Sequence, residues 1–458
     1  MTRRFAVVGS GASGCYAVEA LLRRDPQARV DVIERLPTPF GLIRYGVAPD
    51  HQGTKAVFHT LERFLGHERV RYFGNITIGR DISIEELLAA YDGVILATGI
   101  NRDRKLCVPG EELEGVMGSG VLACWYNDHP EAFDARAMIA RARRVVVIGS
   151  GNVALDIVRV LTKDPREFVG SDLSPATTVA LDGLQIETIA VIGRRGPTHN
   201  KFSLHEFREV AGLASVRVRL DPVARALGVD AAGSKANVLQ ELLALPDLAE
   251  QPSVTGAHAS KRDLHFHFGL EPTAFLPSAT AQGRVGAVRF DTMAWQDGAY
   301  VRTARQVVLP ADLVITCIGY EFHDHFGLGT RDGVLEHDNG RIRERLYVVG
   351  WAKRGASGTI GTNRSDSHTV AAKVCAEVPG TADNSMRNTG IEPLARARGL
   401  QWVDHTGWKR INQAEIDAAG PDRVRCKLTN RGAQLAVGAA PAGTGHASAQ
   451  RPVVAIGP

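Results

Sequence analysis

Two glycine-rich turns, centred near residues 11 and 151, have the residue types and the spacing of dinucleotide-binding sites. The first turn, Gly9-Ser10-Gly11-Ala12-Ser13-Gly14, follows the apolar run Phe5-Ala6-Val7-Val8. The second turn, Gly149-Ser150-Gly151-Asn152-Val153-Ala154, follows Val145-Val146-Val147-Ile148. Glycines between a buried strand and a helix let the backbone approach a pyrophosphate at the helix N-terminus. One such turn is weak evidence, but the pair predicts two dinucleotide sites.

The residues beyond each turn predict different nucleotides. After the first turn, a second apolar strand ends in Glu34, and a carboxylate there accepts hydrogen bonds from the hydroxyls of an unphosphorylated ribose. After the second turn, the apolar run 188–193 is followed directly by Arg194 and Arg195. Guanidinium groups suit a 2′-phosphate because their hydrogen bonds are planar and charge-assisted. The first site therefore indicates FAD or NAD and the second NADP; the alternative for the two arginines is a solvated strand end.

Length and composition indicate a globular protein of two domains. The chain has 458 residues, of which 44% are hydrophobic and 23% charged, and this length exceeds one typical core. A net charge of +4 is too small to predict a nucleic-acid partner. No apolar stretch approaches the roughly 20 residues of a membrane span, and the first strand begins too early for a leader peptide. We expect a cytoplasmic protein, and nothing in the sequence requires more than a monomer.

The cysteines argue against dithiol chemistry. The six cysteines are scattered, and no two form the C-x-x-C pair that a dithiol exchanger needs. They also lack the clustering of an iron–sulfur site. Fifteen histidines are present, but none has the spacing with a carboxylate that predicts zinc, so we expect no metal.

The order of predicted elements is that of an α/β protein. Strand, helix and strand follow one another in two rounds, which predicts two Rossmann-like domains. A helix is expected over 15–24, ending before Pro26. The alternating run 264–268 suggests an antiparallel strand with His265 and His267 on the surface. Residues 439–458 are rich in Ala, Gly and Pro, and we expect a disordered tail.

Five segments resemble one known family. They are Pro39-Phe40-Gly41-Leu42-Ile43-Arg44-Tyr45-Gly46-Val47-Ala48-Pro49-Asp50-His51, Gly151-Asn152-Val153-Ala154-Leu155-Asp156, Arg194-Arg195-Gly196-Pro197, Gly350-Trp351-Ala352-Lys353-Arg354-Gly355 and Gly358-Thr359-Ile360-Gly361-Thr362-Asn363. Together they resemble the adrenodoxin-reductase-like family of ferredoxin–NADP(+) reductases, over residues 5 to about 435. Glutamate synthase small subunits share the two turns but lack the Gly-Trp-x-Lys-Arg-Gly segment.

The resemblance implies an FAD domain interrupted by an NADP domain. The FAD domain would comprise residues 1–108 and 320–438, and the inserted NADP domain residues 109–319. Carried over from the family, the FAD contacts fall on Ser13, Glu34, Leu42, Ile78, Trp351, Gly358, Thr359 and Ile360. The NADP contacts fall on Gly151, Asn152, Val153, Ala154, Arg194, Arg195, Glu206 and Gly358.

The expected reaction depends on cofactor chemistry. NADPH donates two electrons as hydride, an iron–sulfur carrier accepts them singly, and a flavin mediates between the two. The protein supplies position and electrostatics, so no side-chain nucleophile is required. The candidates for catalysis are His51 and Asp156, which the family places close together near the flavin; the alternative is a structural pair. Trp351 is expected to cover the flavin ring, or else to be an ordinary core tryptophan.

Three functions are compatible with these features. The favoured one is an NADPH-dependent reductase of a small acidic, ferredoxin-type iron–sulfur carrier. The second is a flavin oxidase, diaphorase or monooxygenase acting on a small molecule, which requires an enclosed substrate pocket. The third is a non-catalytic sensor of NADP, and the FAD-type turn with the 350–363 segment argues against it.

Overall fold

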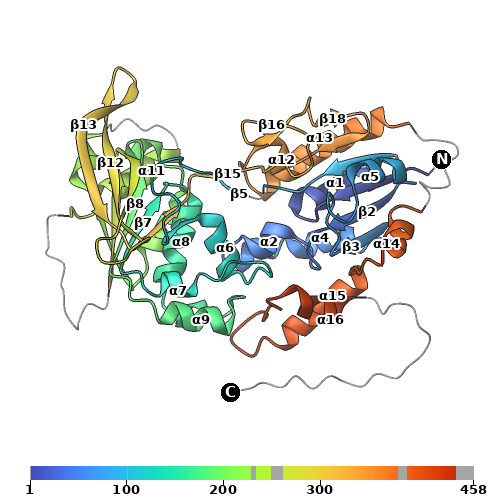
Figure 1. The fold of residues 1–458 in the computed structure, drawn as a ribbon, viewed down its shortest axis with the longest axis horizontal. Helices are drawn as coiled ribbons and strands as arrows, with labels where there is room; N and C mark the ends of the chain where they lie inside the picture. Colours follow the sequence, from blue (N-terminus) through green and yellow to red (C-terminus); the bar gives the residue numbers. More distant parts are fainter. Residues whose placement is uncertain (1, 101, 228–233, 249–260, 380–388, 440–458) are drawn as a thin grey trace.

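The computed structural model describes residues 2–100, 102–227, 234–248, 261–379 and 389–439. The chain forms two α/β halves side by side, with the N-terminal and C-terminal segments in one half and the middle of the chain in the other (Figure 1). Except for Ala439, the expected tail lies outside the described residues.

The first half is built on a six-stranded sheet in the order β18-β19-β4-β1-β2-β3. The strands are β1 (Arg4–Val8), β2 (Arg29–Glu34), β3 (Val70–Gly74), β4 (Gly93–Leu96), β18 (Arg341–Arg343) and β19 (Leu346–Val348). All neighbours are parallel except β18 and β19. Every residue of β1 and β4 is buried, as expected for central strands of a parallel sheet covered on both faces.

The second half has a six-stranded sheet in the order β6-β14-β7-β8-β10-β9, and its neighbours are all parallel. The strands are β6 (Val116–Gly118), β7 (Arg144–Ile148), β8 (Thr188–Gly193), β9 (Val216–Leu220), β10 (Arg262–Phe268) and β14 (Leu313–Thr316). The antiparallel prediction for 264–268 was wrong, because β10 lies between two parallel neighbours and is buried on both faces. His267 is accordingly buried, and its Nδ1 lies 2.7 Å from Asp221 Oδ2.

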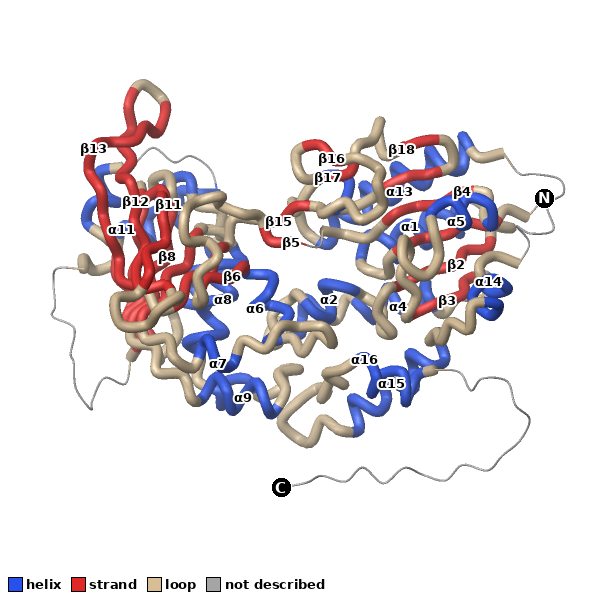
Figure 2. Tube along the Cα trace, in the orientation of Figure 1, coloured by secondary structure: helices blue, strands red, loops and turns tan. Residues whose placement is uncertain are grey.

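An antiparallel sheet covers one face of this second sheet. It consists of β11 (Leu270–Pro277), β12 (Val285–Gln296) and β13 (Ala299–Pro310). Its apolar residues, including Phe275 and Phe290, pack in one cluster with Val146 and Ile192 of the parallel strands. The β12–β13 hairpin projects beyond the parallel sheet (Figures 1 and 2).

Two short strands cross between the halves and pair with each other. They are β5 (Arg102–Asp103) and β15 (Tyr320–Glu321), and they run antiparallel. Asp103 also accepts hydrogen bonds from the backbone amides of Gly120 and Val121, at the N-terminus of α6. The expected division of the chain after residues 108 and 319 stays a prediction; both crossing strands lie within six residues of these boundaries.

Helices flank both sheets. The first half contains α1 (Ala12–Arg24), α2 (Gly41–Tyr45), α3 (Gln52–Lys55), α4 (Phe58–Leu65), α5 (Ile84–Ala90), α12 (Trp351–Arg354), α13 (Ile360–Glu377), α14 (Glu392–Ala397), α15 (His405–Asp417) and α16 (Arg431–Gly438). The second half contains α6 (Ser119–Tyr126), α7 (Arg136–Ile139), α8 (Asn152–Thr162), α9 (Pro175–Asp182), α10 (Leu204–Ala211) and α11 (Ser234–Leu243), with 3-10 turns at Pro165–Phe168, Pro197–His199 and Pro222–Ala226. Two remaining short strands are β16 (Thr330–Arg331) and β17 (Val334–Leu335). Within the described ranges, no helix has both the length and the apolar character needed to cross a membrane.

The helix predicted over 15–24 is α1, which begins three residues earlier, directly after Gly11. It ends at Arg24 because Asp25 is extended and Pro26 cannot continue a helix. Both α1 and α8 therefore begin inside a glycine-rich turn, and each follows a buried parallel strand.

Candidate functional site

The three glycines of the first turn have different surroundings. Gly9 has a φ of 102°, and a Cβ there would collide with the carbonyl oxygen of Ala97 in the neighbouring chain segment. A Cβ at Gly14 would collide with the carbonyl oxygen of Gly9. Gly11 differs, because a Cβ there would have nothing within 4 Å. Two glycines are thus required by the fold, while the third faces open space at the N-terminus of α1, where a phosphate is stabilised.

The second turn repeats this arrangement. Gly149 has a φ of 130°, and a Cβ there would collide with the carbonyl oxygen of Cys317. The atom nearest to a Cβ at Gly151 would be Lys201 Cβ, 3.9 Å away, so the N-terminus of α8 is also open. Asn152 accepts a hydrogen bond from the Ser203 amide at 2.8 Å, and Val153 is 36% exposed. Ala154 replaces the third glycine and is fully buried, which is compatible with helix–strand packing.

Three other predicted FAD contacts differ in how accessible their side chains are. Glu34 Oε2 accepts hydrogen bonds from both the amide and the hydroxyl of Ser10, at 2.9 and 2.7 Å. Leu42 is the second residue of α2, which begins at Gly41 beside the open glycine. A Cβ at Gly41 would lie 3.5 Å from Gly11 Cα, and the Leu42 side chain is 45% exposed. Ile78, in contrast, is only 3% exposed and belongs to the core. The structure thus brings Glu34 and Leu42 to the turn with accessible side chains, whereas the Ile78 side chain is buried.

The 350–363 segment, far from the first turn in sequence, packs against that turn. Gly350 has a φ of 73°, and a Cβ there would collide with Ser13 Oγ, which lies 3.0 Å from Asn363 Oδ1. The short loop after Arg354 leads to Gly358, with a φ of 79°, and to Thr359 and Ile360 at the start of α13. These predicted contacts from distant parts of the sequence therefore form one continuous wall.

Thr98 and Trp351, at this wall, each have a buried polar side-chain atom with no hydrogen-bond partner among the described residues. These atoms are Thr98 Oγ1, two residues after β4, and Trp351 Nε1. The Trp351 ring stacks on Tyr320 of the crossing strand β15, with centroids 6.2 Å apart and an interplanar angle of 18°. Buried polar groups normally have a partner, so these two atoms indicate a ligand. Together with the open Gly11 and the Glu34 carboxylate, they fit a dinucleotide of the FAD type.

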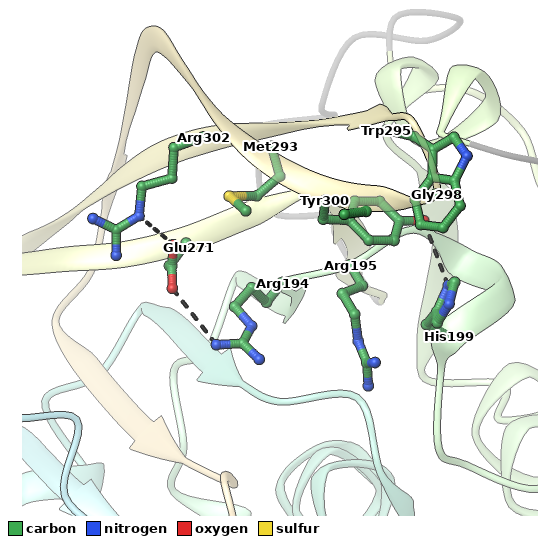
Figure 3. Close-up of a pocket in the computed structure, with 10 residues that line it drawn as sticks. Arg194, Arg195, His199, Glu271, Met293, Trp295, Gly298, Tyr300 and Arg302 are labelled. Carbon is green, nitrogen blue, oxygen red and sulfur yellow. Dashed lines mark hydrogen bonds and ion pairs between the residues drawn. The ribbon is translucent and has the colours of Figure 1, made fainter.

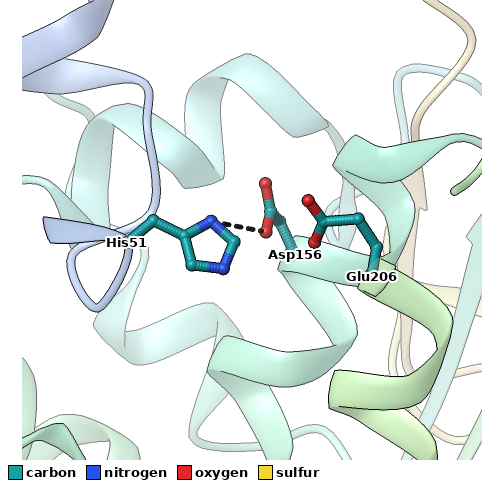
Figure 4. A group of neighbouring side chains, drawn as sticks. All are labelled: His51, Asp156 and Glu206. Atoms are coloured by element: carbon teal, nitrogen blue, oxygen red, sulfur yellow. Dashed lines mark ion pairs between the residues drawn. The ribbon is translucent and has the colours of Figure 1, made fainter. Parts of the chain in front are cut away.

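His51 joins the two halves at the second turn (Figure 4). It follows α2 in the first half, and its Nδ1 lies 3.7 Å from Asp156 Oδ1, one turn into α8. Its Nε2 lies 3.0 Å from Glu209 Oε2 of α10. The predicted pair is therefore close together, and Glu209 is a third member of the site that was not predicted from the sequence. The available signal was the three-residue spacing from Glu206, which places both carboxylates on one face of a helix.

A buried arginine pairs with four carboxylates around this site. The Arg159 side chain is 3% exposed and lies 2.9 Å from Asp156, 3.0 Å from Glu209 and 3.5 Å from Glu206. It also contacts Asp50 at 3.0 Å. Burial raises the pKa of Asp156 to about 6, although Arg159 and His51 oppose that shift. Glu206, predicted as an NADP contact, lies in this cluster, where its carboxylate, Asp156 and His51 have ligand atoms within 4.8 Å of one another.

Arg194 and Arg195 line a surface pocket of about 530 Å³ (Figure 3). They follow β8 directly, at the edge of the sheet where the second turn also lies. The opposite wall comes from the β11–β13 sheet, including Trp295, Tyr300 and Arg302. The two arginines were predicted from the sequence, but this wall was not, because it is formed by residues about 100 positions further along the chain.

Comparison with known proteins identifies the family. Residues 3–164 match the family model described as pyridine nucleotide-disulphide oxidoreductase. The chain is 32% identical to the mitochondrial NADPH:adrenodoxin oxidoreductase of Arabidopsis thaliana, over 89% of each chain. It is 34% identical to the NADPH-ferredoxin reductase FprA of Mycobacterium leprae, over 94% of this chain and 98% of that one. The chain belongs to the adrenodoxin-reductase-like family of ferredoxin–NADP reductases.

Solved structures agree with this assignment. FprA from Mycobacterium tuberculosis, solved in complex with NADPH, superposes with a TM-score of 0.86 at 31% identity and covers 95% of this chain and 99% of its own. The fold class predicted from sequence, two Rossmann-like domains with one inserted into the other, is confirmed. All six cysteines of the chain are free in the structure.

Proposed function

We propose that the chain is an NADPH-dependent flavoprotein reductase of a ferredoxin-type iron–sulfur carrier. It binds FAD at the first glycine turn and NADP(H) at the second. The observation that carries the proposal is the contact of His51, in the first half, with Asp156, one turn into the helix that begins at the second glycine turn. The two nucleotide turns therefore belong to one composite site between the halves, as hydride transfer between the two cofactors requires.

The FAD site is assigned to the first turn and the wall that faces it. The open N-terminus of α1 at Gly11 receives the pyrophosphate, and Glu34 accepts hydrogen bonds from the ribose. Trp351 covers the flavin, and its unpartnered Nε1 donates a hydrogen bond there. When bound, FAD supplies the conversion of a two-electron hydride donor into single-electron transfers. The protein contributes no nucleophile; its residues bind and orient.

The NADP(H) site is assigned to the second turn and the pocket beyond β8. Gly151, Asn152, Val153 and Ala154 present the start of α8 to the pyrophosphate. Arg194 and Arg195 bind the 2′-phosphate, which gives the preference for NADPH over NADH. Gly358, in the wall facing the first turn, is the contact common to both nucleotides.

His51 and Asp156 are assigned to proton management between the cofactors. Burial raises the pKa of Asp156 to about 6, which brings its carboxyl closer to the neutral range in which a proton-transfer group works. Glu209 holds the other nitrogen of the His51 ring at 3.0 Å, which fixes the orientation of the imidazole toward Asp156.

The carrier, the assembly and the compartment complete the proposal. The carrier is a small acidic iron–sulfur protein, for which a chain with a net charge of +4 is electrostatically suited. The enzyme acts as a monomer in the cytoplasm. Its six free cysteines suit a reducing compartment. Sedimentation of the purified protein and fractionation of the source cells test these two assignments, and a dimer or a membrane-bound pool would contradict them.

A steady-state assay tests the function. NADPH is supplied to the purified holoprotein in air, with and without oxidised ferredoxin, and cytochrome c reports electrons that leave the ferredoxin. The proposal predicts that cytochrome c reduction depends on added ferredoxin and saturates with it. NADPH oxidation that is coupled to oxygen uptake at the same rate with or without ferredoxin would instead indicate an oxidase.

A further inference from the structure

The pocket beside Arg194 and Arg195 has an aromatic wall that the reaction described above does not use. Trp295 of β12 and Tyr300 of β13 are cross-strand partners, and Met293 and Arg302 form the next pair on the same face. The Trp295 and Tyr300 rings meet edge to face with centroids 4.8 Å apart. Trp295 is nevertheless 46% exposed, so a large aromatic surface is left open above the two arginines (Figure 3).

The hairpin is held firmly against the chain that carries the arginines. Tyr300 donates a hydrogen bond to the Leu227 carbonyl oxygen at 3.1 Å, and its ring packs edge to face on His199 at 5.3 Å. A Cβ at Gly196, directly after the arginines, would collide with the Tyr300 hydroxyl oxygen. The aromatic wall and the arginine pair are thus fixed relative to each other, as a preformed ligand site requires.

The other end of the pocket carries a third guanidinium. Arg302 donates to Glu271 Oε2 at 2.6 Å, and Glu271 Oε1 lies 3.6 Å from Arg194. Glu271 is 17% exposed, whereas Arg194 and Arg302 are 63% and 60% exposed. Three arginines and one carboxylate give the pocket a net charge of +2. A phosphate monoester carries about −1.5 to −2 at neutral pH, so the charges match.

We propose that the β11–β13 sheet forms the adenosine end of the NADP(H) site. The adenine ring stacks on the Trp295–Tyr300 wall, and Arg302, oriented by Glu271, is a third ligand of the 2′-phosphate beside Arg194 and Arg195. The volume of about 530 Å³ falls within the range of small-molecule sites. This assignment rests on the proposed NADP(H) site but extends it to a part of the fold outside the Rossmann-like motif.

Calorimetric titration of the holoprotein with two redox-inert probes tests the assignment. Adenosine 2′,5′-bisphosphate has both the base and the 2′-phosphate, whereas 5′-AMP lacks the 2′-phosphate. Trp295→Ala should weaken both probes roughly 5- to 100-fold, because base stacking is lost. Arg302→Gln should weaken the bisphosphate roughly 5- to 30-fold and leave 5′-AMP nearly unchanged, because only a charge-assisted contact to the 2′-phosphate is lost.

Matched variants separate a binding role from a folding role. The controls Val308→Ala and Arg305→Gln change an exposed apolar residue and an exposed arginine of β13, the strand that carries Arg302. Neither residue lines the pocket, so both variants should bind both probes as the wild type does. Trp295→Phe keeps an aromatic ring and should lose less affinity than Trp295→Ala at equal flavin content. If Trp295→Ala and Arg302→Gln bind both probes normally while Arg194→Ala does not, this inference is wrong and the NADP(H) site stands. A wild-type protein that binds neither probe overturns both.

Discussion

The buried ion pair between Arg44 and Glu415 is expected to determine the stability of the FAD half. Arg44 belongs to α2, the helix that begins beside the open glycine of the first turn, and Glu415 belongs to α15 near the C-terminus. Arg44 Nη2 donates to both Glu415 carboxylate oxygens, at 2.5 and 2.7 Å, and the two side chains are 5% and 0% exposed. Burial disfavours the Arg44 charge, but Glu415 outweighs it and raises the Arg44 pKa.

Glu415→Gln removes the charge and keeps the shape. In the wild type, Glu415 Oε1 accepts a hydrogen bond from the Leu428 amide at 3.0 Å, and the side-chain amide oxygen of the glutamine can still accept it. Arg44 is left buried without a counter-ion, with Arg425 as a second positive charge 3.5 Å from the same carboxylate. Breaking one partner of a buried pair costs about 3–5 kcal/mol. At about 2–4 °C per kcal/mol for a domain of this size, the midpoint of thermal unfolding should fall by about 6–20 °C.

The assay follows far-UV circular dichroism and the fluorescence of released flavin during heating of the holoprotein. Glu187→Gln is the matched control, since Glu187 pairs with Arg143 at the surface with 53% of its side chain exposed and should cost about 1 kcal/mol or less. The double variant Arg44→Met with Glu415→Leu should recover part of the loss, because the Arg44 charge is removed together with its partner, while Arg425, 11% exposed, still loses its carboxylate. The reasoning is refuted if Glu415→Gln melts with the control, or if the double variant is as unstable as the single one.

Three further predictions concern the nucleotide sites. Gly14→Ala should abolish tight flavin binding, because its Cβ would collide with the backbone of the turn. The control is Gly53→Ala, at an exposed glycine where a Cβ would have nothing within 4 Å, and this variant should keep a full visible flavin spectrum. Equal flavin content in both variants would contradict this prediction. Replacing Arg194 and Arg195 together with alanine should lower kcat/KM for NADPH by roughly 30- to 1000-fold, because about 2–4 kcal/mol of charge-assisted hydrogen bonding is lost. The value of kcat/KM for NADH should change little. Equal losses for the two nucleotides would rule out the 2′-phosphate assignment. Because burial raises the Asp156 pKa from 3.8 to about 6, the ionised carboxylate destabilises the fold above pH 6, and this cost disappears as the pH falls toward 4. The free energy of unfolding of the wild type relative to Asp156→Asn should therefore rise by about 1–3 kcal/mol on acidification from pH 7 to 4, and a pH-independent difference in urea titrations would show that the carboxyl titrates normally.

The features predictable from sequence were those set by local backbone chemistry. Gly9 and Gly149 need positive φ values after a buried strand, so the two turns and the starts of α1 and α8 follow from a few adjacent residues. Glu34 ends a strand that lies next to β1, and its position was therefore fixed by the fold.

The rest depended on contacts between distant segments. The run 264–268 alternates like an antiparallel strand, but its neighbours β8 and β9 made it parallel and buried His267 against Asp221. Glu209 reaches His51 only because α10 packs beside α8, and a single helix does not reveal its partner. The cross-strand pair of Trp295 and Tyr300 faces Arg195 because the antiparallel sheet covers the second parallel sheet, which no local pattern encodes.

Anaerobic reduction of the purified holoprotein tests the central claim most directly. NADPH is added without oxygen while the visible flavin absorbance is followed, and oxidised ferredoxin is then mixed with the bleached protein. We expect rapid bleaching by NADPH, much slower bleaching by NADH, and return of the flavin absorbance as ferredoxin becomes reduced. A flavin that bleaches but passes no electrons to any of several ferredoxins would contradict the carrier assignment. A protein that takes up no FAD would contradict the assignment of the first turn itself.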